Sequence, residues 1–208
     1  MNSPAFFDAV PTIRLYDPLA EFLGALDDGI VEYSYLDAVK LAGHSCPTVA
    51  SAFMITCKAL HALYSGELPQ RGKIRVELRR MDSDGVCGVI ANVASLLTGA
   101  GTQVAFKGIG GRFDRRHTLQ FGAEIQAEMR FTRLDSMQAV DASVNLQYVP
   151  SASRTGELLP KCLHGSASEL EQAEFRQLWQ ARVRAVLLDY ADDPQVFSIT
   201  DQVVASGL

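Results

Sequence analysis

The sequence has no CxxC pair, no long apolar run and no excess of positive charge. A membrane-spanning helix needs roughly 20 consecutive apolar residues, and the apolar runs here are much shorter, so we expect no membrane partner. The formal net charge of -5 argues against a general nucleic-acid-binding protein, which needs clustered positive charge to displace counterions from phosphates. Without a CxxC pair, zinc ribbons and thioredoxin-like sites in their usual forms are excluded.

Cysteine is scarce, with four residues spread along the chain at positions 46, 57, 87 and 162. This spacing does not resemble a dense disulfide framework. The N-terminal segment lacks the basic region followed by an apolar stretch that is typical of a secretion signal. We therefore expect a cytoplasmic protein whose thiols stay reduced and available for metal binding or catalysis.

The order of periodic segments predicts one α+β domain over residues 1–208, with a mixed or antiparallel sheet packed against helices. Helical spacing and capping signals predict helices at 17–28, 35–41, 47–64, 86–99 and 168–190. Alternating apolar residues predict strands at 72–82 and 102–108, and two more strands within about 119–149. A polar stretch, 151–165, is expected to be an irregular loop before the last helix.

The segment LAGHSCPTVASAF, 41–53, places His44 and Cys46 just before a predicted helix that starts at Pro47. In a regular helix these two side chains would diverge, but in a bent turn both can point at one spot. A cysteine at a helix N-terminus also has its thiolate stabilised by free amides and by the helix dipole. The pair is a candidate metal site, and the simpler alternative is a buried thiol beside a histidine that bonds a neighbouring carbonyl.

Cys87 occupies a similar place, because it follows an Asp84-Gly85 turn and begins an apolar helix. Zinc prefers tetrahedral cysteine and histidine ligands, and catalytic zinc sites keep one position open. His44, Cys46 and Cys87 would supply three ligands and leave the fourth position for water, substrate or another side chain. Taken alone, however, Cys87 also fits a small apolar residue in a packed helix.

Cys162 and His164 repeat the pairing of a thiol and an imidazole in the predicted polar loop. This loop is long enough to complete the site or to reach across to a second copy of the chain, so both residues are possible additional ligands. Cys57 and His61 lie too far along the predicted helix from Cys46 to join the same metal ion. We expect a core thiol and a surface or capping histidine there.

A glycine-rich, basic stretch, KGIGGRFDRRH at 107–117, offers backbone amides and arginines to a small anionic ligand. It lacks the lysine pattern of a P-loop and the full GxGxxG spacing, so a flexible connection between strands is the simpler explanation. A small anion therefore remains a possible partner.

Two segments resemble a known family. YLDAVKLAGHSCPTVASAF, 35–53, is similar to the opening motif of the FmdE (formylmethanofuran dehydrogenase E-subunit) family, in which a helix leads into a GHxCPG segment. DSDGVCGVIANVASLLTGAG, 82–101, resembles the second block of that family, a cysteine that opens an apolar helix ending in Thr-Gly. The likeness covers about residues 30–122, and Thr48 stands where family members usually have glycine.

The resemblance implies an α+β domain, commonly a homodimer, that binds zinc or another divalent metal such as nickel or iron through His44, Cys46 and Cys87. It further implies an accessory or undefined enzymatic role near molybdenum or tungsten enzymes. The alternative is a metal-free thiol enzyme, with Cys46 as nucleophile and His44 or His164 as its base. In a third interpretation the cysteines are structural and the last helix docks a partner.

Overall fold

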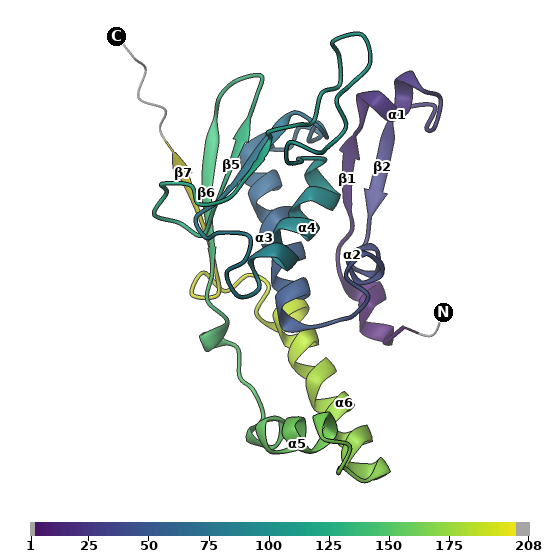
Figure 1. Cartoon of the computed structure of the whole chain (residues 1–208), viewed down its shortest axis with the longest axis vertical. Coiled ribbons are helices and arrows are strands. Elements are labelled where there is room, and N and C mark those ends of the chain that lie inside the picture. Colours follow the sequence, from purple (N-terminus) through teal and green to yellow (C-terminus); the bar gives the residue numbers. More distant parts are fainter. Residues whose placement is uncertain (1–2, 203–208) are drawn as a thin grey trace.

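A single long helix, α3 (Pro47–Tyr64), forms the centre of the fold in this computed structural model, which describes residues 3–202 (Figure 1). It packs against α4 (Cys87–Thr98) and against one face of a five-stranded sheet. The strand order in that sheet is β4-β3-β5-β6-β7, with β3 and β4 parallel and the other neighbours antiparallel. Helices and a mixed sheet thus share one core, and the predicted α+β fold is confirmed.

The strands of the main sheet are short. Their bounds are β3 (Ile74–Leu78), β4 (Leu119–Gln120), β5 (Met129–Arg133), β6 (Ala139–Val144) and β7 (Phe197–Gln202). On β3 the apolar side chains at alternate positions are buried, as the sequence pattern predicts for a strand with one wet face. A separate antiparallel hairpin, β1 (Ile13–Tyr16) and β2 (Ile30–Tyr33), lies on the opposite side of α4 from the main sheet (Figure 1).

Sequence signals account for the ends of the central helices. Pro47 takes the first position of α3, and the helix stops where Ser65 turns left-handed with φ 44° before Gly66. Most of α3 is buried, which fits its largely apolar sequence. Helix α2 (Tyr35–Ala42) likewise ends at Gly43, with φ 74°. The predicted helices at 35–41, 47–64 and 86–99 are therefore confirmed.

The C-terminal helix α6 (Glu169–Arg184) begins at a capping box formed by Ser168 and Glu171, and it continues into a π-helical turn, η3 (Ala185–Asp189). This confirms the helix predicted at 168–190. The prediction of an irregular loop at 151–165 is wrong, because α5 (Ser153–Leu163) occupies most of it. Pro160 lies in the last turn of α5, where the helix is about to end.

Three other local predictions need correction. The helix expected at 17–28 is confined to α1 (Pro18–Phe22), because the chain turns at Gly24 and Gly29 with positive φ. The strand expected at 102–108 is absent, and its apolar Val104 is 86% exposed instead of packed on a sheet. The region 119–149 holds three short strands, and a loop separates β4 from β5.

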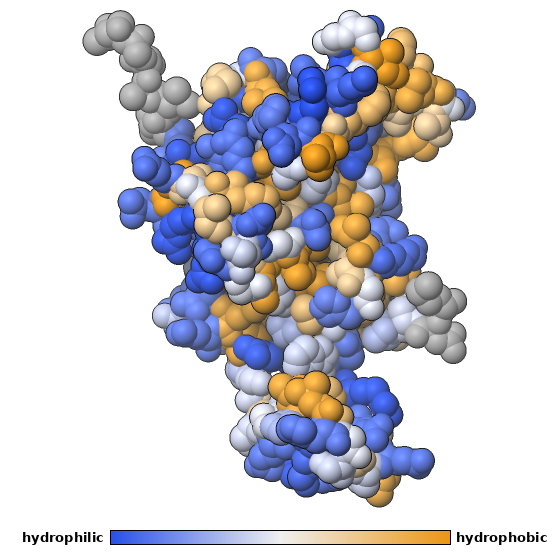
Figure 2. All heavy atoms as spheres, viewed as in Figure 1, coloured by the Kyte–Doolittle hydropathy of each residue, from blue (hydrophilic) through white to orange (hydrophobic). Residues whose placement is uncertain are grey.

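Helices α5 and α6 form a hairpin that projects from the body of the molecule (Figure 1). The body contains the main apolar cluster, whereas the lobe around α5 is mostly polar on the visible face (Figure 2). Apolar side chains are nevertheless exposed near its tip, where Leu163 is 76% and Leu170 83% exposed. Within residues 3–202, no helix is both long and apolar enough to cross a membrane.

Candidate functional site

The turn between α2 and α3 holds Cys46 at the N-cap of α3. Its Sγ accepts a hydrogen bond from the backbone N–H of Val49 at 3.4 Å. Only 8% of Cys46 is exposed, so the thiol lies just beneath the surface. The sulfur therefore faces the free amides of the helix start.

His44 lies two residues earlier and is exposed. Its Nδ1 is 2.9 Å from the backbone carbonyl oxygen of Ala42. A carbonyl oxygen can only accept, so Nδ1 carries a proton, and in the neutral ring Nε2 keeps the lone pair. Metal-binding histidines commonly have this arrangement: one ring nitrogen donates to a protein oxygen, and the other binds the metal.

Ser45, between these two residues, fixes the turn to the rest of the protein. Its carbonyl oxygen accepts hydrogen bonds from Trp179 Nε1 at 3.0 Å and from Gln180 Nε2 at 3.3 Å, both on α6. Its hydroxyl lies 3.1 Å from the Gln180 side-chain oxygen and 2.9 Å from the Tyr35 hydroxyl. Sequence reasoning missed these residues, because more than 130 positions separate Ser45 from its partners on α6 and no local pattern links them.

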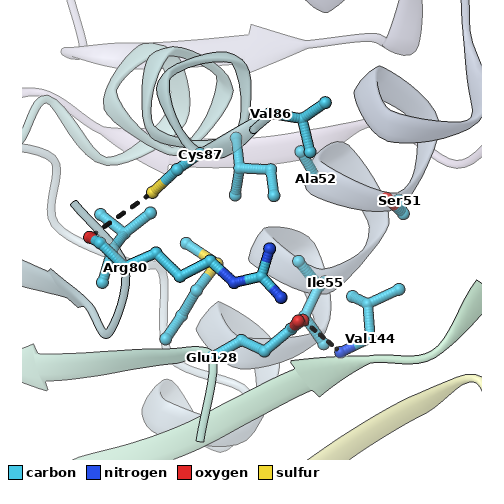
Figure 3. A pocket seen from close by; sticks show the side chains of 11 residues that line it. Ser51, Ala52, Ile55, Arg80, Val86, Cys87, Glu128 and Val144 are labelled. Atoms are coloured by element: carbon cyan, nitrogen blue, oxygen red, sulfur yellow. Dashed lines mark hydrogen bonds between the residues drawn. The ribbon is translucent and has the colours of Figure 1, made fainter. Parts of the chain in front are cut away.

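Cys87 is the first residue of α4 and is only 4% exposed. Its thiol donates to the carbonyl oxygen of Arg80 at 3.7 Å (Figure 3). Burial is the main cause that raises the pKa of the Cys87 thiol, and the charge of Asp84 adds to it. Cys87 is therefore a protonated thiol at neutral pH, and it lines a cavity of about 90 Å³ between α3, α4 and the main sheet.

Cys162 and His164 lie at the C-terminal end of α5. The exposed His164 repeats the arrangement of His44, since its Nδ1 is 2.7 Å from the carbonyl oxygen of Pro160 and its Nε2 is free. This pair is close to the start of α6 at Glu169, whereas Ser45 contacts Trp179, ten residues further on. At 1.5 Å per residue that is roughly 15 Å along the helix.

Residues 3–202 contain no group of three or more histidine, cysteine or acidic side chains that could hold a metal ion. The structure therefore does not assemble His44, Cys46 and Cys87 into one site, and it keeps Cys162 and His164 apart from them within a chain. Cys57 is buried inside α3, where desolvation raises the pKa of its thiol to about 12, and His61 is exposed. Both residues are as the sequence predicts.

An internal carboxylate joins two arginines from distant parts of the sequence. Asp17, at the N-cap of α1, binds Arg71 at 2.7 Å and Arg115 at 2.7 Å. Burial alone would raise the pKa of Asp17, but the hydrogen bonds from both arginines outweigh it and lower the pKa. In the same glycine-rich stretch, Arg116 pairs with Asp114 at 2.7 Å. Two of the arginines considered for a small anion are thus already paired within the chain.

Comparison with known proteins adds no family: no model of a known protein family matches the chain, and no curated protein matches its sequence.

Proposed function

We propose that this protein binds a divalent transition metal, zinc in the first place, through His44 Nε2 and Cys46 Sγ. One observation carries the proposal: the Nδ1–H of His44 is fixed on the Ala42 carbonyl, two residues from a thiol that faces the helix amides. Both groups are thus prepared as ligands before any metal arrives. Nickel and iron accept the same donors, so metal analysis has to identify the ion.

Two donors do not complete a tetrahedral zinc site, so further ligands must come from elsewhere. We propose that they are Cys162 and His164 of a second copy of the chain. Their imidazole has the same fixed tautomer, and they lie on a projecting hairpin with exposed leucines near its tip. In a two-fold symmetric homodimer, each hairpin would reach the other chain and form two equal sites with two cysteines and two histidines each.

The resemblance to the FmdE family supports this proposal, and its implied ligands include His44 and Cys46. A zinc site with four protein ligands is structural, because it has no open position for water or substrate. The proposed role is therefore that of a cytoplasmic accessory protein, whose metal joins two chains, near a molybdenum or tungsten enzyme. A site in which water replaces one hairpin ligand would instead permit catalysis.

Metal content tests the ligands. Protein purified without an affinity tag should hold about one metal ion per chain by elemental analysis. Cys46→Ser should lose most of it, and Cys57→Ala should keep it as the matched cysteine control, because Cys57 is buried in the same helix. Full retention in Cys46→Ser would reject the site. Loss in Cys87→Ala as well, with unchanged folding, would restore Cys87 to the ligand set.

Mixed dimers test whether the ligands come from two chains. One chain carries His44→Ala and Cys46→Ala, and the other carries Cys162→Ala and His164→Ala. A homodimer of either variant should have no complete site. A mixed dimer has two sites, and one of them should have all four ligands. Purified by two different tags that are then cleaved, the mixed dimer should hold about one ion per dimer. No recovery of metal would exclude ligation between the two copies.

A metal-free thiol enzyme remains the alternative, because Cys46, with its sulfur at the start of α3 and two residues from His44, also fits the place of a nucleophile. Here His44 would act as the base through its free Nε2. Alkylation of Cys46 by iodoacetamide distinguishes the two: zinc should protect the thiol under the metal proposal and should have no effect under the alternative.

A further inference from the structure

The cavity beside Cys87 has apolar walls and does not include His44 or Cys46. Its volume is about 90 Å³. An engineered apolar cavity of roughly 150 Å³ accepts benzene, so this one has room for about three or four carbon atoms. The apolar walls include Ala52, Ile55, Leu78, Ile90, Met129 and Val144.

Two opposite charges lie at this cavity and are not paired with each other. The guanidinium of Arg80 and the carboxylate of Glu128 both extend toward the cavity (Figure 3). Among the described residues, Arg80 forms no ion pair within 4.0 Å, either with Glu128 or with another carboxylate. Oε2 of Glu128 accepts from the N–H of Val144 at 3.0 Å, and this bond holds the carboxylate in place. Each charge is therefore available to a ligand.

The charges around the cavity select the kind of ligand. Asp82, Asp84 and Glu128 all act to raise the pKa of the Cys87 thiol, and Arg80 alone among these charged neighbours lowers it. A simple carboxylate on Arg80 would thus face an excess of negative charge, while a simple amine on Glu128 would lie close to the Arg80 cation. A ligand with both charges satisfies both residues.

We infer that this cavity binds a small aliphatic α-amino acid. Its carboxylate binds the guanidinium of Arg80, its ammonium group binds the carboxylate of Glu128, and its aliphatic side chain fills the space between α3, α4 and the sheet. Burial of the side chain supplies most of the favourable free energy, and the two charged hydrogen bonds supply specificity. This ligand site goes beyond the proposed metal site, and neither proposal depends on the other.

Titration calorimetry with three related probes tests the ligand class. L-valine should bind saturably. Isovalerate lacks the ammonium group of valine and isobutylamine lacks its carboxylate, so each should bind at least roughly tenfold more weakly, since a hydrogen bond to a charged group is lost. Absence of saturable valine binding would overturn the inference, and so would equal affinity for valine and either analogue.

Variants test the residues. Arg80→Gln should weaken valine binding at least roughly tenfold without weakening isobutylamine binding, and Glu128→Gln should weaken valine binding without weakening isovalerate binding. Arg79→Gln is the matched control, because Arg79 is adjacent in sequence but bonds the Gln126 carbonyl outside the cavity. Equal loss in Arg79→Gln and Arg80→Gln would overturn the assignment. Cys46→Ser should bind valine like the unaltered protein, which keeps this test separate from that of the metal site.

Discussion

The starts of α3 and α4 look alike in sequence but differ in chemistry. Cys46 is the N-cap of α3 and its sulfur accepts a helix amide, whereas Cys87 is one position further, inside the first turn of α4, and its thiol donates to the Arg80 carbonyl. The α3 start is also bound to α6 through Ser45. One residue of displacement thus separates the thiol of the proposed metal site, which accepts a helix amide, from a thiol that donates to a carbonyl oxygen and stays protonated.

The largest expected effect is on stability in the presence of metal. Zinc that binds only the folded protein should stabilise it by about 2.7 kcal/mol when free zinc is 100 times the dissociation constant. Cys46→Ala should lose this gain, and Cys87→Ala should keep it. Thermal unfolding with zinc and with a chelator measures the difference within each variant, so that a general packing effect of either substitution cancels. Equal zinc dependence in both variants would remove the distinction between the two helix starts.

A smaller effect should follow from releasing the α3 start from α6. Trp179→Phe keeps an aromatic ring against Phe175 but removes the hydrogen bond to the Ser45 carbonyl. We expect the free energy of unfolding of the metal-free protein to fall by about 1 kcal/mol. Denaturant unfolding measures this free energy. Gln177→Ala, at an exposed position on the same helix, is the control. An unchanged value for Trp179→Phe would show that this anchor contributes nothing.

The smallest expected effect concerns the α4 start. Asp84→Asn removes a negative charge that raises the pKa of the Cys87 thiol, and its amide oxygen can still accept from the N–H of Met81. The pKa of Cys87 should therefore fall, and alkylation of Cys87 at pH 8 should become faster. Mass spectrometry gives the alkylation rate of each thiol in protein that also carries Cys46→Ser. Cys57 is the unreactive control, because burial raises the pKa of its thiol to about 12. A slower reaction of Cys87 would contradict this assignment of charges.

The helices that carry the site were predictable because their signals are local. Cys46 and Pro47 define the start of α3. Gly43 and Gly99, both in the left-handed conformation, end α2 and α4. The sequence patterns did not predict the hairpin β1–β2 or strand β7. The two strands of the hairpin are short, and β7 forms by pairing with β6, which is distant in the sequence. The segment around the exposed Val104 shows the opposite error: its apolar pattern predicted a strand, but the segment pairs with no sheet.

The site itself was only partly predictable. The sequence placed His44 and Cys46 at a helix start, and it could not reveal that Nδ1 of His44 bonds Ala42 or that Ser45 contacts α6. Those contacts depend on the bend of one turn and on the packing of distant helices. The unpaired charges of Arg80 and Glu128 were not anticipated either, because they come together only when β3 and the end of the loop before β5 lie side by side.

Anomalous diffraction at the zinc edge tests the central claim most directly. A crystal of the zinc-loaded protein should show one strong peak per chain at about 2.0 to 2.3 Å from both His44 Nε2 and Cys46 Sγ. Peaks confined to Cys87 or to other residues, or no ordered peak in protein that has bound zinc, would contradict the assignment of the metal to the α2–α3 turn.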